Sequence, residues 1–427
     1  MGMKWRRIAS RALAVLLTVL MSSAGLPAYS VLTHEEIVDL LWHDAIRPLV
    51  LHRFPGLTDD QMKEAHAHAY GGSVIQDLGY YPFGSKEFSD LVHYVRSGDF
   101  VRELLLESQD ADEYAFALGA LSHYASDIDG HPAVNQAVAI EYPKLRKKYG
   151  PSVRYAQDRT AHLKTEFGFD TLQVAKNRYA PDQYHDFIGF QVSVPLLERV
   201  FPVVYGLPLK SVLTHEDLAV GSYRWAISRL IPEMTQVALQ THKKELVHET
   251  PDFAKEKFLY HLSRSDYERY WGKGYTKPGL GTRILSTLLR LVPKVGPFKG
   301  LGFNNPTPHT EDLYIKSINT TVDDYTALLR EVGSNKLVLA NCDLDSGNVT
   351  KAAEYTLADE TYATLLAKLS ADKFDGTSPE LRENILAFYS DSSAPIETRK
   401  DAGRWEAVQT NLSLLKAAAV PAGDAKR

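Results

Sequence analysis

The stretch HYASDIDGHP, residues 123–132, places two histidines and two aspartates directly after AFALGALS, residues 115–122, which is almost wholly apolar. The two stretches together predict a helix that is apolar on nearly every face. His123 and Asp127 are four residues apart, so both project from the same buried face of that helix. Burying a carboxylate without a partner costs several kcal/mol or more. We therefore expect metal ions to offset this cost.

The end of this helix is predicted from two residues that disfavour helical structure. Gly130 and Pro132 are expected to stop the helix, which leaves His131 in a following loop that can fold back toward the site. Asp129 lies on another face of the helix than Asp127, so we take Asp127 as the candidate ligand.

A second histidine–carboxylate pair, His162 and Glu166, repeats the four-residue spacing on the next predicted helix. Imidazole nitrogens and carboxylate oxygens are the usual zinc ligands where cysteine is absent, and zinc takes four donors in a structural site. Alone, such a pair is more often a surface ion pair than a ligand set. Together with His123, Asp127 and His131, it favours metal binding at more than one site.

Length, composition and the N-terminal segment bound the class of protein. The 427 residues are 44% hydrophobic and 24% charged, which is typical of a globular protein. Residues 1–28 carry four basic side chains, a largely apolar run of ten and small residues, the pattern of a secretory signal peptide, and predict a secreted or periplasmic protein. Its removal changes the formal charge from −5 to −9, which argues against nucleic acid as the main partner. The single cysteine, Cys342, excludes an internal disulfide.

Helical periodicity dominates the chain and sustained period-two alternation is scarce, so the sequence predicts an all-α fold. Helices are predicted within residues 34–46, 112–128, 154–167, 192–204, 220–242, 352–369 and 403–419. A Gly/Pro-rich stretch, residues 278–308, indicates a domain joint. The predicted divisions are a signal peptide (1–28), a catalytic domain (29–250), a basic Gly/Pro-rich joint (251–310) and a helical C-terminal region (311–427).

The joint has an unusual charge pattern. Between Glu268 and Glu311 the chain has no acidic residue but seven basic ones, and apolar residues between Ile284 and Val292 gather on one helix face. This pattern is typical of a basic amphipathic segment, so residues 269–310 predict a surface that docks on an anionic membrane. A helix packed on the catalytic domain is an equally good interpretation.

In the order and spacing of these motifs, the chain resembles the bacterial zinc-dependent phospholipase C family. That family is related to three-zinc single-strand nucleases and to glycosylphosphatidylinositol-cleaving phospholipase D. The resemblance covers roughly residues 29–250 and implies a multi-helix fold whose core holds up to three zinc ions, here followed by a C-terminal helical extension. Eight residues separate His123 from His131, as in the phospholipase D relatives, and Leu78 stands where choline-preferring enzymes have an aromatic residue. The headgroup preference therefore stays open.

The resemblance implies nine metal-ligating residues. One zinc would use Asp77, His93, His123 and Asp127, and a second would use His131, His162 and Glu166. The third would use His34, Asp127 as a bridge, and the free amino group and carbonyl of Tyr29. This last set predicts signal cleavage between Ala28 and Tyr29, with cleavage after Ser30 as the alternative.

The implied reaction is phosphodiester hydrolysis, because closely spaced divalent cations polarise phosphoryl oxygens and lower the pKa of a bound water. We expect a phospholipase C in which a metal-bound hydroxide attacks phosphorus while Asp77 orients or deprotonates the water. The alternatives are a single-strand nuclease or nucleotidase with the same metals, and a non-catalytic, metal-stabilised lipid-binding protein. The sequence does not indicate an oligomeric state.

Two further groups of residues are weaker candidates. His66 and His68 lie two residues apart and cannot share a helix face, so we interpret them as surface or outer residues rather than ligands. Tyr80, Tyr81 and Phe83 fit a cation–π box for a quaternary ammonium group, although packing around a turn is the favoured interpretation.

Overall fold

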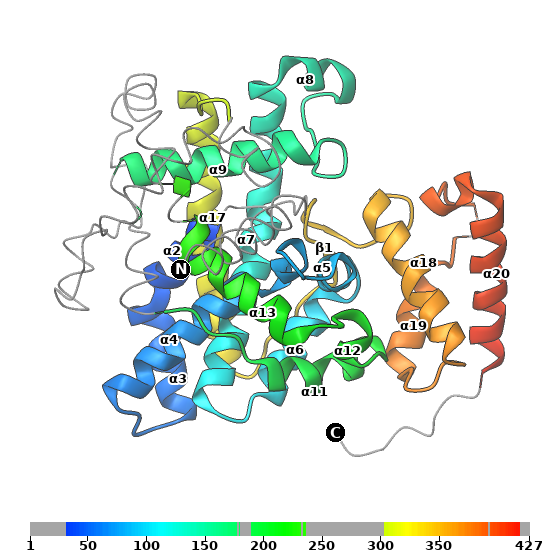
Figure 1. Ribbon diagram of the computed structural model, residues 1–427, viewed down its shortest axis with the longest axis horizontal. Coiled ribbons are helices and arrows are strands. Elements are labelled where there is room, and N and C mark those ends of the chain that lie inside the picture. Colours follow the sequence, from blue (N-terminus) through cyan, green and yellow to red (C-terminus); the bar gives the residue numbers. More distant parts are fainter. Residues whose placement is uncertain are drawn as a thin grey trace, which may run out of the picture.

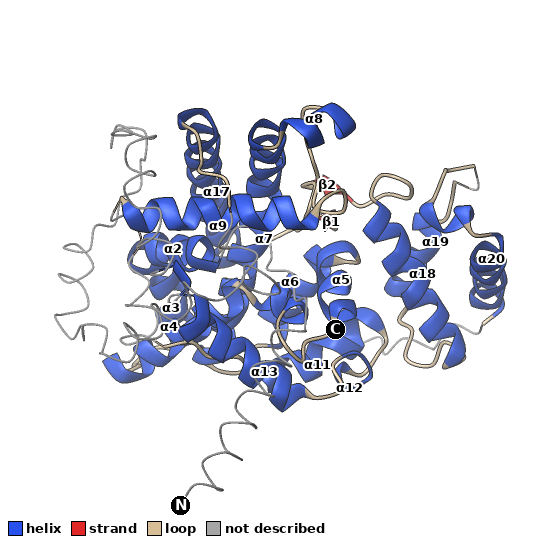
Figure 2. Cartoon of the chain, turned by 45° about the horizontal axis from the view of Figure 1, so that its top comes forward, coloured by secondary structure: helices blue, strands red, loops and turns tan. Residues whose placement is uncertain are grey.

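The structure is a computed structural model that describes residues 31–176, 179, 189–231, 234–235, 303–391 and 393–418. Helices make up nearly all regular structure in these ranges, and one two-stranded sheet accompanies them, which confirms the predicted all-α class (Figure 2). The predicted signal peptide and nearly all of the basic stretch 269–310 lie outside the described residues.

The elements fall into two series along the chain. The first comprises α2 (Val31–Leu41), η1 (Trp42–Ile46), α3 (Arg47–Arg53), α4 (Asp59–Ser73), η2 (Ile75–Tyr80), α5 (Lys86–Tyr94), α6 (Ser97–Glu107), α7 (Ala111–Glu141), α8 (Pro143–Tyr149), α9 (Arg159–Ala175), α11 (Val194–Tyr205), α12 (Leu209–Val212), α13 (Glu216–Trp225) and η4 (Ala226–Leu230). The second comprises α17 (Pro308–Gly333), β1 (Cys342–Asp343), β2 (Asn348–Val349), α18 (Thr356–Ala371), α19 (Pro379–Phe388), η7 (Glu397–Lys400) and α20 (Ala402–Ala417). No helix in the described ranges combines the length and hydropathy needed to cross a membrane.

The central helix α7 continues well beyond its predicted end (Figure 1). It spans 31 residues to Glu141 with Pro132 in its interior, so the prediction that Gly130 and Pro132 stop it is wrong. The helix is buried along most of its length, and this tertiary packing outweighs the lost backbone hydrogen bond. The freed carbonyl of Ile128 is covered by the β1–β2 loop, where a Cβ on Gly347 would lie 2.5 Å from that oxygen.

Glycines let α4 and α7 cross at very short range. A Cβ on Gly72 would lie 1.9 Å from the carbonyl oxygen of Phe116, and one on Gly119 would lie 2.0 Å from that of Ala69. No side chain larger than hydrogen fits at either position without moving a helix. The crossing brings the C-terminal end of α4 directly beside α7.

Two predicted helices begin later than expected. Helix α9 starts at Arg159 rather than near residue 154, because the Asp158 side chain accepts a hydrogen bond from the Ala161 N–H at 2.9 Å and caps the helix. Helix α18 starts at Thr356 rather than at residue 352. The helical assignments themselves are confirmed.

Helix α17 packs along α7 although more than 160 residues separate the two in sequence (Figure 1). The Tyr325 hydroxyl donates to the Leu118 carbonyl at 2.8 Å, and the Tyr314 ring stacks on Phe169 with centroids 4.4 Å apart. The described residues after 303 therefore share a hydrophobic core with the first series of elements. The predicted division into domains at 250 and 310 remains a prediction.

Candidate metal centre

Helix α7 presents one polar face inside the protein. His123, Asp127 and His131 follow one another at four-residue steps, so their side chains leave the helix on the same side, and all three are fully buried. The prediction that His131 lies in a loop is therefore wrong. Asp129 points away, as expected: burial and the nearby charge of Asp324 on α17 raise its pKa to about 7.

Two groups of buried side chains share His123. One group is Asp77, His93 and His123, and the other is His34, His123 and Asp127; in each, one ligand atom per residue lies within 4.8 Å of the others. Asp127 reaches both groups, because its Oδ1 lies 3.6 Å from His34 Nε2. Its Oδ2 lies 3.5 Å from His93 Nε2 and 3.0 Å from His123 Nε2. The structure thus brings together the first predicted ligand set and the described part of the third.

A further group combines α7 with α9. His131, His162 and Glu166 have ligand atoms within 4.8 Å of one another, and His162 Nε2 lies 2.7 Å from Glu166 Oε1. The rings of His131 and His162 meet edge to face with centroids 5.4 Å apart. These are the three residues of the second predicted ligand set.

Backbone carbonyls orient three of the imidazoles. The Nδ1 atoms of His93, His123 and His131 lie 2.7, 2.9 and 2.6 Å from the carbonyl oxygens of Ser89, Ser73 and Leu344, respectively. A carbonyl only accepts, so each Nδ1 carries a proton, and in the neutral imidazole Nε2 then keeps its lone pair. This tautomer and its backbone partner are typical of metal-bound histidines.

Several of the polar atoms that face one another in these groups lack hydrogen-bond partners. Both carboxylate oxygens of Asp77, Asp127 and Glu166 are buried without a hydrogen bond, and so are the Nε2 atoms of His123 and His131. Leaving a buried polar group unsatisfied costs about 1–3 kcal/mol, and more for a charged one. A divalent cation among these atoms would satisfy them together. Nitrogen and oxygen donors without sulfur suit zinc, so the donor set fits the predicted ion.

Opposite charges dominate the electrostatics around Asp127. Burial raises its pKa, but the neighbouring imidazoles, His123 foremost, outweigh this and hold the pKa well below its ordinary value. Burial lowers the pKa of His93, but the adjacent carboxylates of Asp127 and Asp77 outweigh this and raise it well above its ordinary value. The protein without metal therefore holds this part of the site as an ionised network.

Around His162 and Glu166, desolvation dominates instead. Burial, followed by the charge of Asp127, raises the pKa of Glu166 well above its ordinary value. Burial, followed by the charge of His131, holds the pKa of His162 well below its ordinary value. Asp77 also has a raised pKa, because burial outweighs the attraction of its histidine neighbours.

The ninth predicted ligand, Tyr29, lies outside the described residues. The chain directly after it is firmly held: the Leu32 N–H donates to Asp170 Oδ2 at 3.0 Å, and the Thr33 hydroxyl donates to Asp170 Oδ1 at 2.6 Å. Asp170 is fully buried on α9. It fixes the first turn of α2, from which His34 enters the site.

The weaker histidine candidates belong to none of the three groups. His66 is fully buried, with Nε2 3.0 Å from Asp39 Oδ1, so the prediction that it lies on the surface is wrong. The alternative, a residue near the site that is not itself a ligand, agrees with its absence from the three groups. His68 is partly exposed and lies 3.8 Å from Asp112.

The aromatic candidates do not converge on one box. The Tyr80 ring lies 6.0 Å from that of His93, whereas Tyr81 packs edge to face on Tyr223 at 5.1 Å. Phe83 is 54% exposed. Packing, the favoured interpretation, describes Tyr81 best, and Tyr80 lies next to the candidate ligand His93.

Sequence reasoning missed one acidic residue at the centre. Asp345, in the β1–β2 loop, is 4% exposed and places Oδ1 3.5 Å from His131 Nδ1. No helical spacing links it to the other candidates. The only signal is local: two aspartates, Asp343 and Asp345, flank a buried leucine outside any helical pattern.

The geometry agrees with the comparison of the chain with known families. Residues 33–214 match the family model for zinc-dependent phospholipase C, and this range contains all eight described candidate ligands. No curated protein and no solved structure matches the chain significantly. The similarity covers less than half of the chain, and it indicates that residues 33–214 form a zinc-dependent phosphodiesterase domain of the phospholipase C type.

Proposed function

We propose that the protein is an exported phospholipase C that holds three zinc ions and hydrolyses the phosphodiester bond of phospholipids. One observation carries the proposal: eight buried histidine and acidic side chains converge in three groups with their ligand atoms facing one another. They do so inside a domain whose family acts on phospholipids.

Each group would hold one ion. The first ion would be bound by Asp77, His93, His123 and Asp127, and the second by His131, His162 and Glu166. The third would be bound by His34, Asp127 and the amino group and carbonyl of Tyr29 at a mature N-terminus. Asp127 would bind both the first and the third ion, which explains why imidazoles from both groups surround its carboxylate.

When bound, the ions would neutralise the phosphoryl oxygens, lower the pKa of a coordinated water and stabilise the leaving alkoxide. The chain's own part is to hold these positions rigidly. Ligands carried on α5 and α7 and oriented by backbone carbonyls need little reorganisation during the reaction, and preorganised charge stabilisation is usually the largest catalytic contribution.

Asp77 is the proposed proton acceptor. Its carboxylate is fully buried, lies 3.3 Å from His93 Nε2 and has no hydrogen-bond partner at either oxygen. Burial raises its pKa, which makes it a better base than an exposed aspartate. It would orient the attacking water and accept its proton at a carboxylate oxygen.

Export is part of the proposal because the third ion needs a free amino group. Asp170 holds the backbone only a few residues after Tyr29, which supports a fixed position for a terminus at that residue. Mass spectrometry of the exported protein should find Tyr29 as the first residue. A first residue at Val31 or an uncleaved chain would contradict the third site.

A membrane surface is the proposed partner. The predicted docking stretch, residues 269–310, lies outside the described residues. The described helix α8 supports a basic surface: Lys144, Arg146, Lys147 and Lys148 are all exposed on it. Sedimentation with anionic and with zwitterionic liposomes tests this, and equal binding to both would contradict electrostatic docking.

The function is tested with two substrates in parallel. Purified protein is incubated with phosphatidylcholine and, separately, with single-stranded RNA, each with and without a zinc chelator. We expect release of the phosphorylated headgroup from the lipid, stopped by the chelator and restored by zinc. Release of mononucleotides without lipid hydrolysis would instead support the nuclease alternative, and inactivity on both would contradict the proposal.

A further inference from the structure

The β1–β2 hairpin touches the metal centre although it begins more than 120 residues beyond the family domain. The carbonyl of Leu344 accepts the hydrogen bond from His131 Nδ1 at 2.6 Å. The Leu344 N–H donates to the His93 carbonyl at 3.2 Å. One residue of the hairpin therefore contacts histidines from two different groups.

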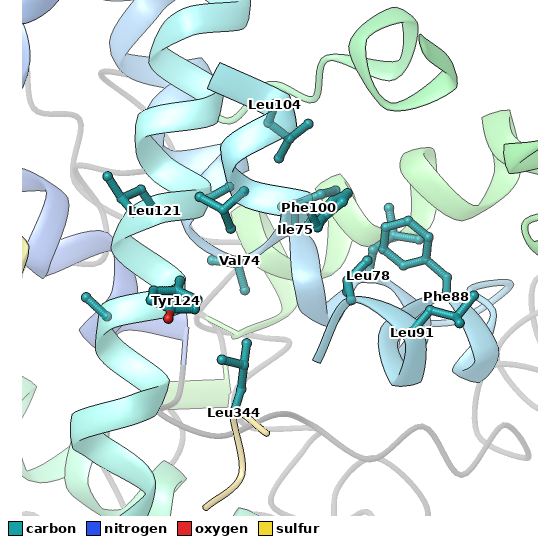
Figure 3. Packing of buried hydrophobic residues seen from close by; sticks show 14 of the residues in the cluster. Val74, Ile75, Leu78, Phe88, Leu91, Phe100, Leu104, Leu121, Tyr124 and Leu344 are labelled. Carbon is teal, nitrogen blue, oxygen red and sulfur yellow. The ribbon is translucent and has the colours of Figure 1, made fainter. Parts of the chain in front are cut away.

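The hairpin is held firmly enough to orient a ligand. Leu344 is fully buried in the hydrophobic core, in the same cluster as Val74 and Tyr124 (Figure 3). The Ser97 hydroxyl donates to the Cys342 carbonyl at 2.6 Å and accepts from the Cys342 N–H at 3.0 Å. These contacts fix the strand β1, which leads into the loop.

Asp345 adds a negative charge beside His131. Its Oδ2 accepts hydrogen bonds from the hydroxyls of Tyr94, at 2.8 Å, and Tyr355. Its Oδ1 remains directed toward His131 and lies 3.5 Å from Nδ1. Asn135 on α7 donates to its backbone carbonyl at 3.2 Å. The carboxylate is thus fixed at the edge of the imidazole that points away from the metal group.

We propose that Asp345 is a positioning residue for the second metal ion, and that the hairpin completes a site that the family domain alone leaves incomplete. The inference rests on the proposed metal binding. A carboxylate beside Nδ1–H favours the tautomer with a free Nε2 lone pair and makes that nitrogen more basic. The Nε2 of His131, which has no hydrogen-bond partner, is the atom that would bind zinc.

A structural role of Asp345 makes a different prediction. If the carboxylate only tied the hairpin to Tyr94 and Tyr355, its loss would weaken folding and all metal sites together. A positioning role weakens one binding step and leaves the others unchanged. Outer partners of metal ligands typically contribute a factor of about 10–100 in metal affinity.

The test is Asp345→Asn in the full-length chain, with zinc binding measured by titration against a competing chelator. Each zinc ion should bind in a separate step of this titration, and the step that is lost in Glu166→Gln belongs to the second ion. In Asp345→Asn we expect that step to weaken about 10–100-fold and the remaining steps to keep their affinities. The spectrum of the cobalt-substituted protein should change for the same step only.

Asp359→Asn is the matched control. Asp359 is 2% exposed in the same region of the chain, and it accepts hydrogen bonds from the N–H groups of Ala353 and Glu397, both at 2.8 Å. Its loss should lower the thermal midpoint without changing any zinc-binding step. Parental zinc binding in Asp345→Asn, or weakening of every step in parallel, would overturn the proposal. Neither result depends on lipid hydrolysis. Failure of this inference can therefore be distinguished from failure of the proposed phospholipase activity.

Discussion

The two histidine–carboxylate pairs of the candidate metal centre have the same local geometry, but the pKa values of their carboxyl groups are shifted in opposite directions. On α7, His123 Nε2 lies 3.0 Å from Asp127 Oδ2, and on α9, His162 Nε2 lies 2.7 Å from Glu166 Oε1. Both pairs have a four-residue spacing. The pKa of Asp127 is held well below its ordinary value, whereas that of Glu166 is raised well above it. Helical spacing creates both pairs but does not determine their charge.

The neighbours of each pair account for the difference. Asp127 lies within 3.6 Å of imidazole nitrogens from His34, His93 and His123, which arrive on three separate helices. Glu166 has a close imidazole partner in His162, whose own pKa is lowered by burial. The imidazoles around Asp127, His123 foremost and then His131 and His93, outweigh its desolvation, whereas the charges near Glu166 add to the effect of burial.

The largest expected effect comes from Asp127→Asn. It removes the carboxylate shared by two metal groups, so we expect phospholipid hydrolysis to fall by at least about 100-fold. In chelator-treated protein the surrounding imidazoles also lose their counter-charge, and the free energy of unfolding should fall by about 3 kcal/mol. Activity assays, zinc content and urea unfolding measure these effects.

Asp129→Asn is the control for that substitution. It lies two residues further along the same helix and faces α17 instead of the metal groups. It should retain zinc and activity. If Asp127→Asn kept both as well, the shared role of Asp127 would be excluded.

Gly119→Ala should disturb the first pair without touching the second. The added methyl group would lie 2.0 Å from the Ala69 carbonyl, so α4 must move away from α7 and carry the Ser73 carbonyl away from His123. Overpacking of this kind costs about 1–3 kcal/mol. Thermal unfolding and zinc titration should show lower stability and weaker binding at the groups that share His123.

Gly221→Ala on α13 provides the matched control, because nothing lies within 4 Å of the Cβ it would add. It should keep all zinc-binding steps and leave stability unchanged or raised by up to about 1 kcal/mol. Unchanged zinc binding in Gly119→Ala would show that the α4–α7 crossing does not orient His123.

Glu166→Gln should have the opposite effect on stability from Asp127→Asn once metal is removed. A carboxyl with a raised folded-state pKa stabilises the protein below its unfolded value of 4.5, and this contribution is lost as pH rises through the folded value. The metal-free parent should therefore lose stability with rising pH relative to Glu166→Gln. Urea unfolding at pH 5 and pH 8 measures the free energy of unfolding of both metal-free proteins. A parent that loses no more stability than Glu166→Gln between these pH values would contradict the raised pKa.

The smallest effect on metal binding is expected at Glu141, a buried carboxyl outside the three candidate metal groups. It accepts hydrogen bonds from the Thr310 and Thr165 hydroxyls at 2.9 and 3.2 Å, and burial raises its pKa to about 8. Its stabilising contribution is complete below pH 4.5 and falls as pH rises toward 8. Glu141→Gln should remove this fall, which a pKa of about 8 against 4.5 makes about 3 kcal/mol between pH 5 and pH 8. Identical pH dependence in parent and variant would contradict it.

Much of the site could be predicted because its residues follow local rules. His123 with Asp127, and His162 with Glu166, are visible as four-residue spacings on helices. The resemblance to a known family added His34, Asp77 and His93, which no local spacing connects to the others. The end of α7 was predicted wrongly because burial against neighbouring elements outweighs the helix-breaking effect of Pro132.

The sequence by itself determined the all-α class and which residues of α7 and α9 face the candidate metal centre, because a period of 3.6 residues and a spacing of four are properties of one helix. Tertiary structure decided the charge of each carboxylate, the continuation of α7 through Pro132 and the arrival of Asp345 beside His131. These features depend on desolvation and on partners that are distant in sequence. Their energies are set by which elements pack together, and local sequence does not specify that.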